Sequence, residues 1–547
     1  MPDEPEKKDR DLTGAQALIR FLQSAGVDTI FGYPGGANLP IYDELANSGI
    51  THVLSRHEQG AVHMADGFAR VSGRSGVCLA TSGPGATNLV TGLATAMMDS
   101  IPLVALTGQI PRTHIGTDSF QEVDCINITM PVTKHNELIF HEKDLVPALQ
   151  TAFHVANTGR KGPVLLDFPK DVLLKEYPHS FSDPLRLPGY NPTTEAKVKP
   201  LKWMLSLLTK AKRPIILFGG GIVSAGAVPE FLQFVRSLQI PVVRTLMGTG
   251  VIPEQDPLYI GMIGTHGNRT ANRIVHEEAD VLFAVGTRMG DRSTIDASLF
   301  AKNAKVIHLD IDPAETGKNI ATKVKIVGDI KKSLLIMNRE IAEKKLGFEE
   351  PWTTETKRTT LLSTKDSAEI LAVIYGELSK IDRKLHISTD VGRHQMWASH
   401  YCTNPKHLPL ITSGGLGTMG FGLPAAIGAW HADPKTPVVC LSGDGSFMMT
   451  MQEFAVAVER RVPITVCILN DYRLTMIREL QASAYDCRYT THDFSKNMNF
   501  PKLAEAMGGV GIRIDKRKAI GPTLRKVISS RVPTLIDFDL ERISQSS

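Results

Sequence analysis

The sequence alternates short, continuous apolar runs with longer amphipathic stretches along almost its whole length. Strands that are apolar on both faces and joined by helices are typical of parallel sheets covered on both sides. Helices are expected at 86–98 and at about 449–460. The expected strands lie at 76–80, 102–106, 214–218, 280–285, 437–441 and 463–469. The pattern predicts an α/β protein built from doubly wound parallel sheets.

Two polar stretches divide the chain into three parts. The first, from Pro178 to Pro200, holds five prolines and few apolar residues, and the second is the threonine-rich segment 349–360. Proline removes a backbone donor and seldom lies inside a sheet, so both stretches are expected to be linkers. A chain of 547 residues is long enough for three domains of ordinary size. The domains are expected at 1–180, 195–345 and 360–547.

Composition and charge exclude several classes of protein. The 61 basic residues nearly balance the 57 acidic ones, so no strong field favours nucleic acid or a membrane surface. The chain has no run of 18 apolar residues, and its polar first residues resemble no targeting segment. The six cysteines show no metal-binding spacing and several lie in apolar runs, which favours reduced thiols. We expect a soluble, cytoplasmic protein.

A Gly-Asp-Gly sequence follows the expected strand at 437–441. Asp444 lies there, and Asp471 follows the next strand 27 residues later, so one crossover helix brings the two to the same sheet edge. Two carboxylates suit Mg²⁺, and the helix N-terminus at Ser446 can help to hold a diphosphate. The alternative interpretation is a glycine turn carrying two solvated aspartates.

Glu58 and three glycine-rich turns complete the polar features. Glu58 opens an expected helix, where a carboxylate is usually only a favourable N-terminal charge. The turns at 32–36, 81–88 and 413–422 would each ordinarily connect a strand to a helix. Together they indicate that backbone approaches a ligand in both the first and the third domain.

These motifs together resemble the thiamine-diphosphate enzymes, and most closely the catalytic subunits of acetolactate (acetohydroxyacid) synthases. The likeness extends from Leu12 to about Asp539. It rests on RHEQGA around Glu58, GPGATN at 83–88, GTDSFQE at 116–122, SGGLGTMGFGLPAAIGA at 413–429, and the GDGS and ND pair at 443–446 and 470–471.

The resemblance implies roles for residues at the cofactor. Glu58 matches the glutamate that bonds the aminopyrimidine ring and takes part in moving a proton, and Met419 matches the apolar wedge that bends the cofactor. The implied Mg²⁺ site comprises Asp444, Asp471 and Arg473, although many relatives carry Asn in place of Asp471. Arg393 replaces the usual Gln and could pair with a phosphate. Further implied thiamine-diphosphate contacts are Gly35, Pro84, Asn88, Gly392, His394, Gly417, Gly443, Gly445 and Ser446.

The middle domain resembles the version of the fold that binds FAD. A triple glycine after a strand is a weak dinucleotide signal alone, but the GTHGN, GTRMGDR and HLDIDPAETGKN runs favour FAD. The implied contacts are Arg160, Gly219, Gly220, Gly221, Thr245, Leu246, His266, Gly267, Gly286, Arg288, Asp291, Asp310, Ile311 and Asp329. Arg292 matches the arginine that holds the carboxylate of an incoming 2-oxo acid.

The substrate pocket departs from the family pattern. Phe120, Gln121 and Lys170 match residues that line the active site, although a lysine after a strand is often only a surface residue. The pocket also includes Ile477. Leu480 stands where biosynthetic relatives have a tryptophan that selects the larger acceptor, Thr265 replaces a methionine, and Thr113 replaces a basic residue. The acceptor pocket is therefore expected to be reshaped.

The resemblance implies decarboxylation of pyruvate and ligation to a second 2-oxo acid, giving 2-acetolactate for branched-chain amino-acid synthesis. It also implies a homodimer or homotetramer with the site between subunits, and a possible regulatory small subunit. Related 2-oxo acid decarboxylases or carboligases with another acceptor are the nearest alternative. A flavin or nucleotide oxidoreductase is a different class, and a non-catalytic regulatory member is disfavoured by the presence of Glu58 and Asp444.

Overall fold

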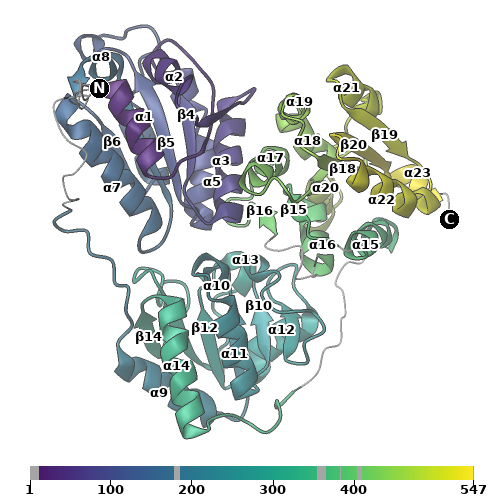
Figure 1. Ribbon diagram of the computed structural model, residues 1–547. Helices are drawn as coiled ribbons and strands as arrows, with labels where there is room; N and C mark the ends of the chain where they lie inside the picture. The colour runs from purple at the N-terminus through teal and green to yellow at the C-terminus, as the bar shows by residue number, and fades with distance from the viewer. Residues whose placement is uncertain are drawn as a thin grey trace, which may run out of the picture.

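The computed structural model describes residues 12–177, 185, 187–353, 365–381, 383–402 and 410–545, which form three domains (Figure 1). Each domain contains a six-stranded sheet in which all neighbouring strands are parallel. Nearly every central strand is buried along its length, as expected for sheets covered by helices on both faces. The predicted fold class of doubly wound parallel sheets is confirmed.

The N-terminal sheet has the order β3-β2-β4-β5-β7-β6. Its strands are β2 (Thr29–Gly32), β3 (Thr51–Leu54), β4 (Gly76–Ala80), β5 (Leu103–Gln109), β6 (His135–Leu138) and β7 (Pro163–Pro169). Its helices are α1 (Gly14–Ser24), α2 (Leu39–Leu45), α3 (Glu58–Ser72), α4 (Pro84–Thr87), α5 (Val90–Asp99), α6 (Cys125–Thr129), α7 (Leu145–Asn157) and α8 (Lys170–Leu174). A short antiparallel pair, β1 (Leu12–Thr13) and β8 (Glu176–Tyr177), joins the ends of this domain.

The middle sheet has the order β11-β10-β9-β12-β13-β14. Its strands are β9 (Pro214–Phe218), β10 (Val242–Arg244), β11 (Tyr259–Met262), β12 (Val281–Val285), β13 (Lys305–Asp310) and β14 (Val324–Val327). The helices are α9 (Val198–Thr209), α10 (Gly221–Ser224), α11 (Val228–Leu238), α12 (Arg269–Arg273), α13 (Asp291–Thr294) and α14 (Ile330–Lys344).

The C-terminal sheet has the order β16-β15-β17-β18-β20-β19. Its strands are β15 (His386–Thr389), β16 (Ile411–Thr412), β17 (Val438–Gly443), β18 (Ile464–Asn470), β19 (Val510–Ile514) and β20 (Thr534–Asp539). Its helices are α15 (Lys365–Ser379), α16 (Arg393–Tyr401), α17 (Gly422–Ala432), α18 (Asp444–Thr450), α19 (Glu453–Glu459), α20 (Thr475–Ala484), α21 (Phe500–Ala506), α22 (Ile520–Ser530) and α23 (Leu540–Gln545).

The predicted strands match observed ones within a few residues, but both predicted helices are interrupted. The stretch 86–98 is divided between α4 and α5, and 449–460 between α18 and α19. At the first break Leu89 N bonds Ala86 O, and at the second Phe454 N bonds Met451 O, both i→i+3 bonds that tighten the backbone. Much of the two expected linkers, including 178–184 and 354–360, lies outside the described residues.

All six cysteines carry free thiols, five of them buried, whereas Cys487 is exposed. This observation agrees with the prediction that the cysteine thiols are reduced. Within the described ranges, no helix combines the length and apolar character needed to cross a membrane.

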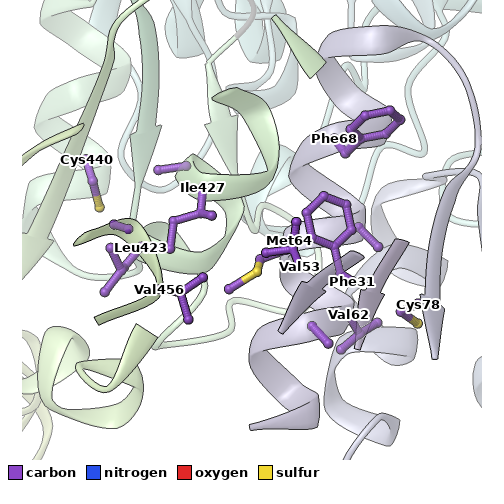
Figure 2. Packing of buried hydrophobic residues seen from close by; sticks show 14 of the residues in the cluster. Phe31, Val53, Val62, Met64, Phe68, Cys78, Leu423, Ile427, Cys440 and Val456 are labelled. Atoms are coloured by element: carbon purple, nitrogen blue, oxygen red, sulfur yellow. The ribbon is translucent and has the colours of Figure 1, made fainter. Parts of the chain in front are cut away.

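Helices α3 and α17 join the N-terminal and C-terminal domains into one hydrophobic core. Met64 on α3 lies beside Leu423 on α17 and Val456 on α19, and Phe31 and Phe68 extend the same cluster into the N-terminal domain (Figure 2). This core spans residues from both domains, whereas the middle domain has separate clusters of its own. The outer two domains therefore behave as one packed body.

Two glycines allow the backbones of these helices to touch. A Cβ added at Gly67 would overlap the carbonyl of Ala425, and one added at Gly428 would overlap the carbonyl of Met64. Because the clashing atoms belong to backbone rather than to flexible side chains, the helices would have to separate to accept even a methyl group.

Replacing Gly428 with Ala should lower the midpoint of thermal unfolding, because overpacking at a rigid contact costs about 1–3 kcal/mol. The matched control is Gly376→Ala in α15, where an added Cβ meets nothing within 4 Å. That substitution should be neutral or stabilising by about 0.5–1 kcal/mol. Equal midpoints for the two variants, measured by thermal unfolding, would contradict the close contact between α3 and α17.

Candidate active site

Glu58 lies at the start of α3 and faces the turn between β4 and α4. His57 caps the helix by accepting a hydrogen bond from Gln59 N at 3.0 Å. Asn88 Nδ2 donates to Glu58 Oε2 at 2.9 Å, so the amide fixes the carboxylate from the opposite element. The structure thus brings together Glu58 and Asn88, two residues singled out from separate motifs.

The glycine turn before Pro84 lies against the loop that carries Gln121. Gly83 has φ +60°, and a Cβ there would lie 2.9 Å from the Gln121 carbonyl oxygen. Gln121 itself has φ +61°, an unusual conformation for a residue with a side chain. Gly35 approaches the same turn, since its Cβ would meet the side chain of Thr81. Gly35, Pro84, Glu58, Asn88 and Gln121 therefore surround one site in the N-terminal domain.

A buried carboxyl that the sequence did not identify supports the Gln121 loop. Asp167 accepts from Gln109 Nε2 at 2.9 Å, and the same amide donates to the Val123 carbonyl at 3.0 Å. Burial raises the pKa of Asp167 to about 7. Nearby, Phe120 is 87% exposed, and Lys170 is partly exposed at the first position of α8.

In the C-terminal domain, His394 lies where three loops meet. A Cβ on Gly392 or Gly443 would lie 2.8 or 3.2 Å from His394 Cε1, and Ser446 Oγ donates to the Val391 carbonyl at 3.1 Å. The buried Nε2 of His394 has no hydrogen-bond partner among the described residues. Burial lowers the pKa of His394 to about 4, so its ring is neutral at pH 7. A ligand bound at this edge of the sheet could form a hydrogen bond with His394 Nε2.

Asp390, which the sequence analysis missed, connects these loops. Its Oδ1 accepts from Gly420 N at 2.7 Å and from Val391 N at 3.2 Å, and its Oδ2 accepts from Ser442 Oγ at 3.1 Å. Burial raises its pKa to about 6. The available signal was an acidic residue placed between an apolar strand and a glycine.

Asp444 and Asp471 follow β17 and β18, which are neighbours in the sheet. Burial raises the pKa of Asp444 to about 7, with a further contribution from the charge of Asp471. The pKa of Asp471 is also raised, chiefly by burial. A buried and a partly buried carboxylate, one of which raises the pKa of the other, fit a bound divalent cation, which would relieve both effects. Within the described ranges no set of three or more His, Cys, Asp and Glu could ligate a metal, so this pair would need additional oxygen ligands.

Arg473 does not offer its side chain to such a cation. Its guanidinium pairs with Glu541 at 2.8 Å and bonds the Asp471 carbonyl at 3.0 Å. Only its backbone carbonyl, which accepts from Thr475 N at 3.1 Å, could act as a ligand. A Cβ at Gly445 would lie 2.9 Å from the Leu474 side chain, which a larger residue would have to displace.

Helix α20 approaches the same edge through Arg393. Arg393 lies over the Trp397 ring at 4.6 Å and pairs with Glu479 of α20 at 3.1 Å. Ile477 and Leu480 on this helix are 42% and 55% exposed. Leu480 therefore directly follows Glu479, the residue that pairs with Arg393, and the Leu480 side chain lies outside the core.

Gly219 and Gly221 of the middle domain each lie in close contact with Gly286. A Cβ on Gly219 would lie 2.5 Å from the Gly286 carbonyl oxygen, and one on Gly221 equally close to Gly286 Cα. Gly220 faces Met247, in the short helix that follows Thr245 and begins at Leu246. These glycines allow two loops to cross at the carboxyl ends of β9 and β12.

Arg292 lies beside the loop that carries Thr265. The Thr265 amide donates to the Arg292 carbonyl at 2.9 Å. Burial lowers the pKa of His266, with a smaller contribution from the charge of Arg292. Gly267 lies in the same turn, and Asp291 opens the short helix α13. Thr265 and Arg292 are both exposed.

Other residues that the resemblance implies for FAD binding form hydrogen bonds or ion pairs with protein groups. Arg160 pairs with Glu315 at 2.8 Å, and Asp329 caps α14 by accepting from Lys332 N at 2.8 Å. Burial raises the pKa of Asp310 to about 6; Ile311, which follows it, is partly buried. Glu315 Oε2 and His308 Nδ1 are buried without a partner among the described residues, so polar atoms for a ligand are present here.

Comparisons with known proteins agree with this arrangement. Residues 12–128 match the N-terminal TPP binding domain of thiamine pyrophosphate enzymes, residues 201–336 the central domain, and residues 390–538 the C-terminal TPP binding domain. The chain is 43% identical to the probable acetolactate synthase large subunit of Methanococcus aeolicus, over 98% of this chain and 93% of that protein.

Two further relatives give the same result. Identity is 43% to the acetolactate synthase of Arthrospira platensis, over 97% of this chain and 94% of that one. It is 42% to the acetolactate synthase isozyme 3 large subunit of Escherichia coli strain K12, over 92% and 90% of the two chains. With three matching domains and such extensive identity, this chain belongs to the thiamine pyrophosphate enzymes, within the family of acetolactate synthase large subunits.

Proposed function

We propose that this chain is the catalytic subunit of an acetolactate synthase, which joins the two-carbon unit left by decarboxylation of pyruvate to a second 2-oxo acid. The observation that carries the proposal is the pair Asp444 and Asp471, a buried and a partly buried carboxylate with raised pKa values beyond adjacent strands. Such a pair is costly unless a cation lies between them. In a protein of this family the cation would be Mg²⁺ bound to a diphosphate.

The diphosphate would be held by residues around the same edge. His394 Nε2 is a buried polar atom without a partner among the described residues, and Ser446 lies in the first turn of α18, where backbone amides point outward. Arg393 adds a positive charge, which suits a phosphate. Gly392, Gly443 and Gly445 would let the backbone approach closely.

Glu58 would act on the other end of the cofactor. Thiamine diphosphate, when bound, supplies the carbon acid on which 2-oxo acids are decarboxylated and joined. Glu58 would hold and return a proton at the aminopyrimidine ring, and Asn88 keeps the carboxylate in one orientation. Gly417 would offer its carbonyl to the ring, Met419 an apolar surface, and Phe120, Gln121 and Lys170 would line the site.

The middle domain is proposed to bind FAD without using it for redox turnover. Support comes from the crossing glycines at Gly219–Gly221 and Gly286 and from Glu315 Oε2 and His308 Nδ1, which are buried and have no hydrogen-bond partner within the described ranges. Other proposed contacts are Thr245, Leu246, His266, Gly267, Arg288, Asp291, Asp310, Ile311, Asp329 and Arg160. The ion pair of Arg160 with Glu315 would have to open for that arginine to reach a ligand.

Arg292 is proposed to hold the carboxylate of the acceptor, and Thr265, Ile477 and Leu480 to form its side-chain pocket. Leu480 offers a smaller and more flexible surface than a tryptophan would. One methylene in a pocket is worth only about 1–3 kcal/mol, so this change removes much of any preference for 2-oxobutyrate over pyruvate.

The proposed assembly is a homodimer or homotetramer in which the N-terminal domain of one chain faces the C-terminal domain of another. A regulatory small subunit is proposed because relatives are named large subunits. The proposal places the protein in the cytoplasm and in branched-chain amino-acid synthesis.

The two ends of the cofactor site are tested by a pair of substitutions. Glu58→Gln should bind thiamine diphosphate normally but lose turnover by about 10²–10⁴-fold, because an amide cannot exchange the proton. Asp444→Asn should weaken binding of Mg²⁺ and thiamine diphosphate together by more than about tenfold. Calorimetric binding and acetolactate assays measure both effects, and normal turnover by Glu58→Gln would refute the proton role.

The metal site also predicts a pH dependence. Because the pKa of Asp444 is raised to about 7, the cation competes with a proton below that pH. In the parent protein the half-saturating Mg²⁺ concentration should therefore rise as the pH falls from 8 to 6. Mg²⁺-independent cofactor binding would show that the Gly-Asp-Gly site has been misinterpreted.

The FAD proposal predicts a yellow protein with about one flavin per chain after reconstitution. Absorbance of the washed protein, and of flavin released on denaturation, measures occupancy. The flavin should remain oxidised through repeated turnovers with pyruvate under anaerobic conditions. Reconstituted protein that retains no flavin would instead belong with the flavin-free synthases, and reduction of the flavin by substrate would favour an oxidoreductase.

Leu480→Trp should raise the preference for 2-oxobutyrate over pyruvate by about tenfold, because the indole ring packs against the extra methyl group. Competition between the two acceptors at equal concentration measures this ratio. The matched control is Leu335→Trp, since Leu335 on α14 is 49% exposed and lies in the middle domain. A preference unchanged by Leu480→Trp would mean that this residue lies outside the acceptor pocket, and an aldehyde as the sole product would identify a decarboxylase.

A further inference from the structure

All three domains meet at the turn formed by Gly414 and Gly415. A Cβ on Gly414 would clash with the sulfur of Met247 in the middle domain. A Cβ on Gly415 would lie 2.9 Å from both Arg288 Nη2, also in the middle domain, and Asp99 Oδ1 of the N-terminal domain. The turn itself belongs to the C-terminal domain and follows β16. Any larger residue at these two positions would therefore have to displace side chains of the other two domains.

Asp99, the last residue of α5, binds this turn with both carboxylate oxygens. Gly415 N donates to Oδ1 at 2.7 Å, and Gly414 N donates to Oδ2 at 3.1 Å. Two consecutive amides on one carboxylate fix the orientation of the peptide plane between them as well as its position. Thr95, one turn earlier on α5, adds a hydroxyl contact of 2.7 Å with Thr418.

The carboxylate of Asp99 is in turn held by a buried arginine. Arg70 Nη2 bonds Asp99 Oδ2 at 2.9 Å, and Arg70 Nε bonds Asp66 Oδ1 at 2.5 Å. Arg70 Nη1 also donates to the Thr412 carbonyl at 3.0 Å, just before the turn. Burial alone would lower the pKa of Arg70, but the two carboxylates raise it above its ordinary value. The cluster is thus charged, buried and connected to the turn from two sides.

We propose that Asp99 is a positioning residue for the thiamine-diphosphate site, acting through the Gly414–Gly415 turn on Gly417 and Met419. This inference rests on the proposed function, in which Gly417 and Met419 contact the cofactor. Between the turn and α17 the chain is held within the C-terminal domain, where Gly420 N donates to Asp390 at 2.7 Å and Thr418 N donates to Ser413 Oγ at 3.0 Å. Asp99 adds a restraint from the N-terminal domain at the start of this segment, on Gly414 and Gly415.

The test compares Asp99→Asn with Asp66→Asn. Both substitutions remove one carboxylate charge from Arg70, but only the first disturbs the turn, because one of its two amides would then face the NH₂ group of the asparagine. Asp66→Asn therefore controls for the loss of charge within the same cluster. Thermal unfolding of both variants shows whether the two folds are comparably stable.

Three measurements separate positioning from general destabilisation. In ligand-free protein, Asp99→Asn should speed amide hydrogen exchange in the peptide 411–421, whereas Asp66→Asn leaves that peptide as in the parent. The half-saturating thiamine-diphosphate concentration should rise about tenfold in Asp99→Asn. The kcat at saturating cofactor should also fall about tenfold, with changes below about twofold in Asp66→Asn.

Equal effects of the two substitutions on exchange and on cofactor affinity would overturn the proposal. If Asp99→Asn does not fold, Asp99→Glu provides the second test, because it keeps the charge beside Arg70 but displaces the carboxylate from the two amides by one methylene. It should raise the half-saturating concentration about threefold, and an unchanged value overturns the proposal. A parent protein that binds no thiamine diphosphate would refute the proposed function instead. In that case the exchange measurement still decides whether Asp99 holds the turn.

Discussion

The direct contact between the backbones of α3 and α17 fixes the N-terminal and C-terminal domains relative to each other, and the rest of the structure depends on it. Gly67 and Gly428 make this contact possible, and each helix continues into functional elements. Helix α3 begins at Glu58 and carries Arg70 near its other end, while α17 is preceded by the loop that contains Gly417 and Met419. Fixing the two helices therefore sets the position of the loop that contains Gly417 and Met419 relative to the N-terminal domain. Asp99, which pairs with Arg70, adds hydrogen bonds from the N-terminal domain to Gly414 N and Gly415 N.

Several carboxyl groups are buried at or near the carboxyl ends of strands, and one, Glu453, is buried at the start of α19. Burial raises the pKa values of Asp167, Asp390, Asp444 and Glu453 into the range of about 6 to 7. An acid whose pKa is raised by folding stabilises the folded state at low pH, and that contribution is lost as the pH rises through the folded-state value. At neutral pH these groups therefore reduce the stability of the ligand-free protein. A bound cation would reverse this effect at Asp444, which links stability to occupancy of the site.

The sequence predicted the parallel sheets because buried strands are apolar along their whole length, as at 214–218. It also predicted that Asp444 and Asp471 lie beyond adjacent strands, because a single helical crossover was expected between them; the crossover consists of α18 and α19. It did not predict Asp99, Asp390 or Glu453, since a buried carboxylate is recognised by its partners and those are distant in the chain. Glu453, for example, accepts a hydrogen bond from Arg56 N of the N-terminal domain at 3.1 Å. The sequence also did not predict the breaks after α4 and α18, because a local i→i+3 hydrogen bond does not change the spacing of apolar residues.

The core shared by the N-terminal and C-terminal domains determines the order in which parts of the chain can fold during synthesis. Helix α3 leaves the ribosome early, but the helix that covers its apolar face comes from the last third of the chain. The middle domain, with clusters of its own, can fold while that face is still open to solvent. Pairing α3 with α17 closes a very large loop, a step that is slow and leaves apolar surface exposed in the meantime. During synthesis the nascent chain therefore carries an uncovered helix face, which is the natural target for a chaperone.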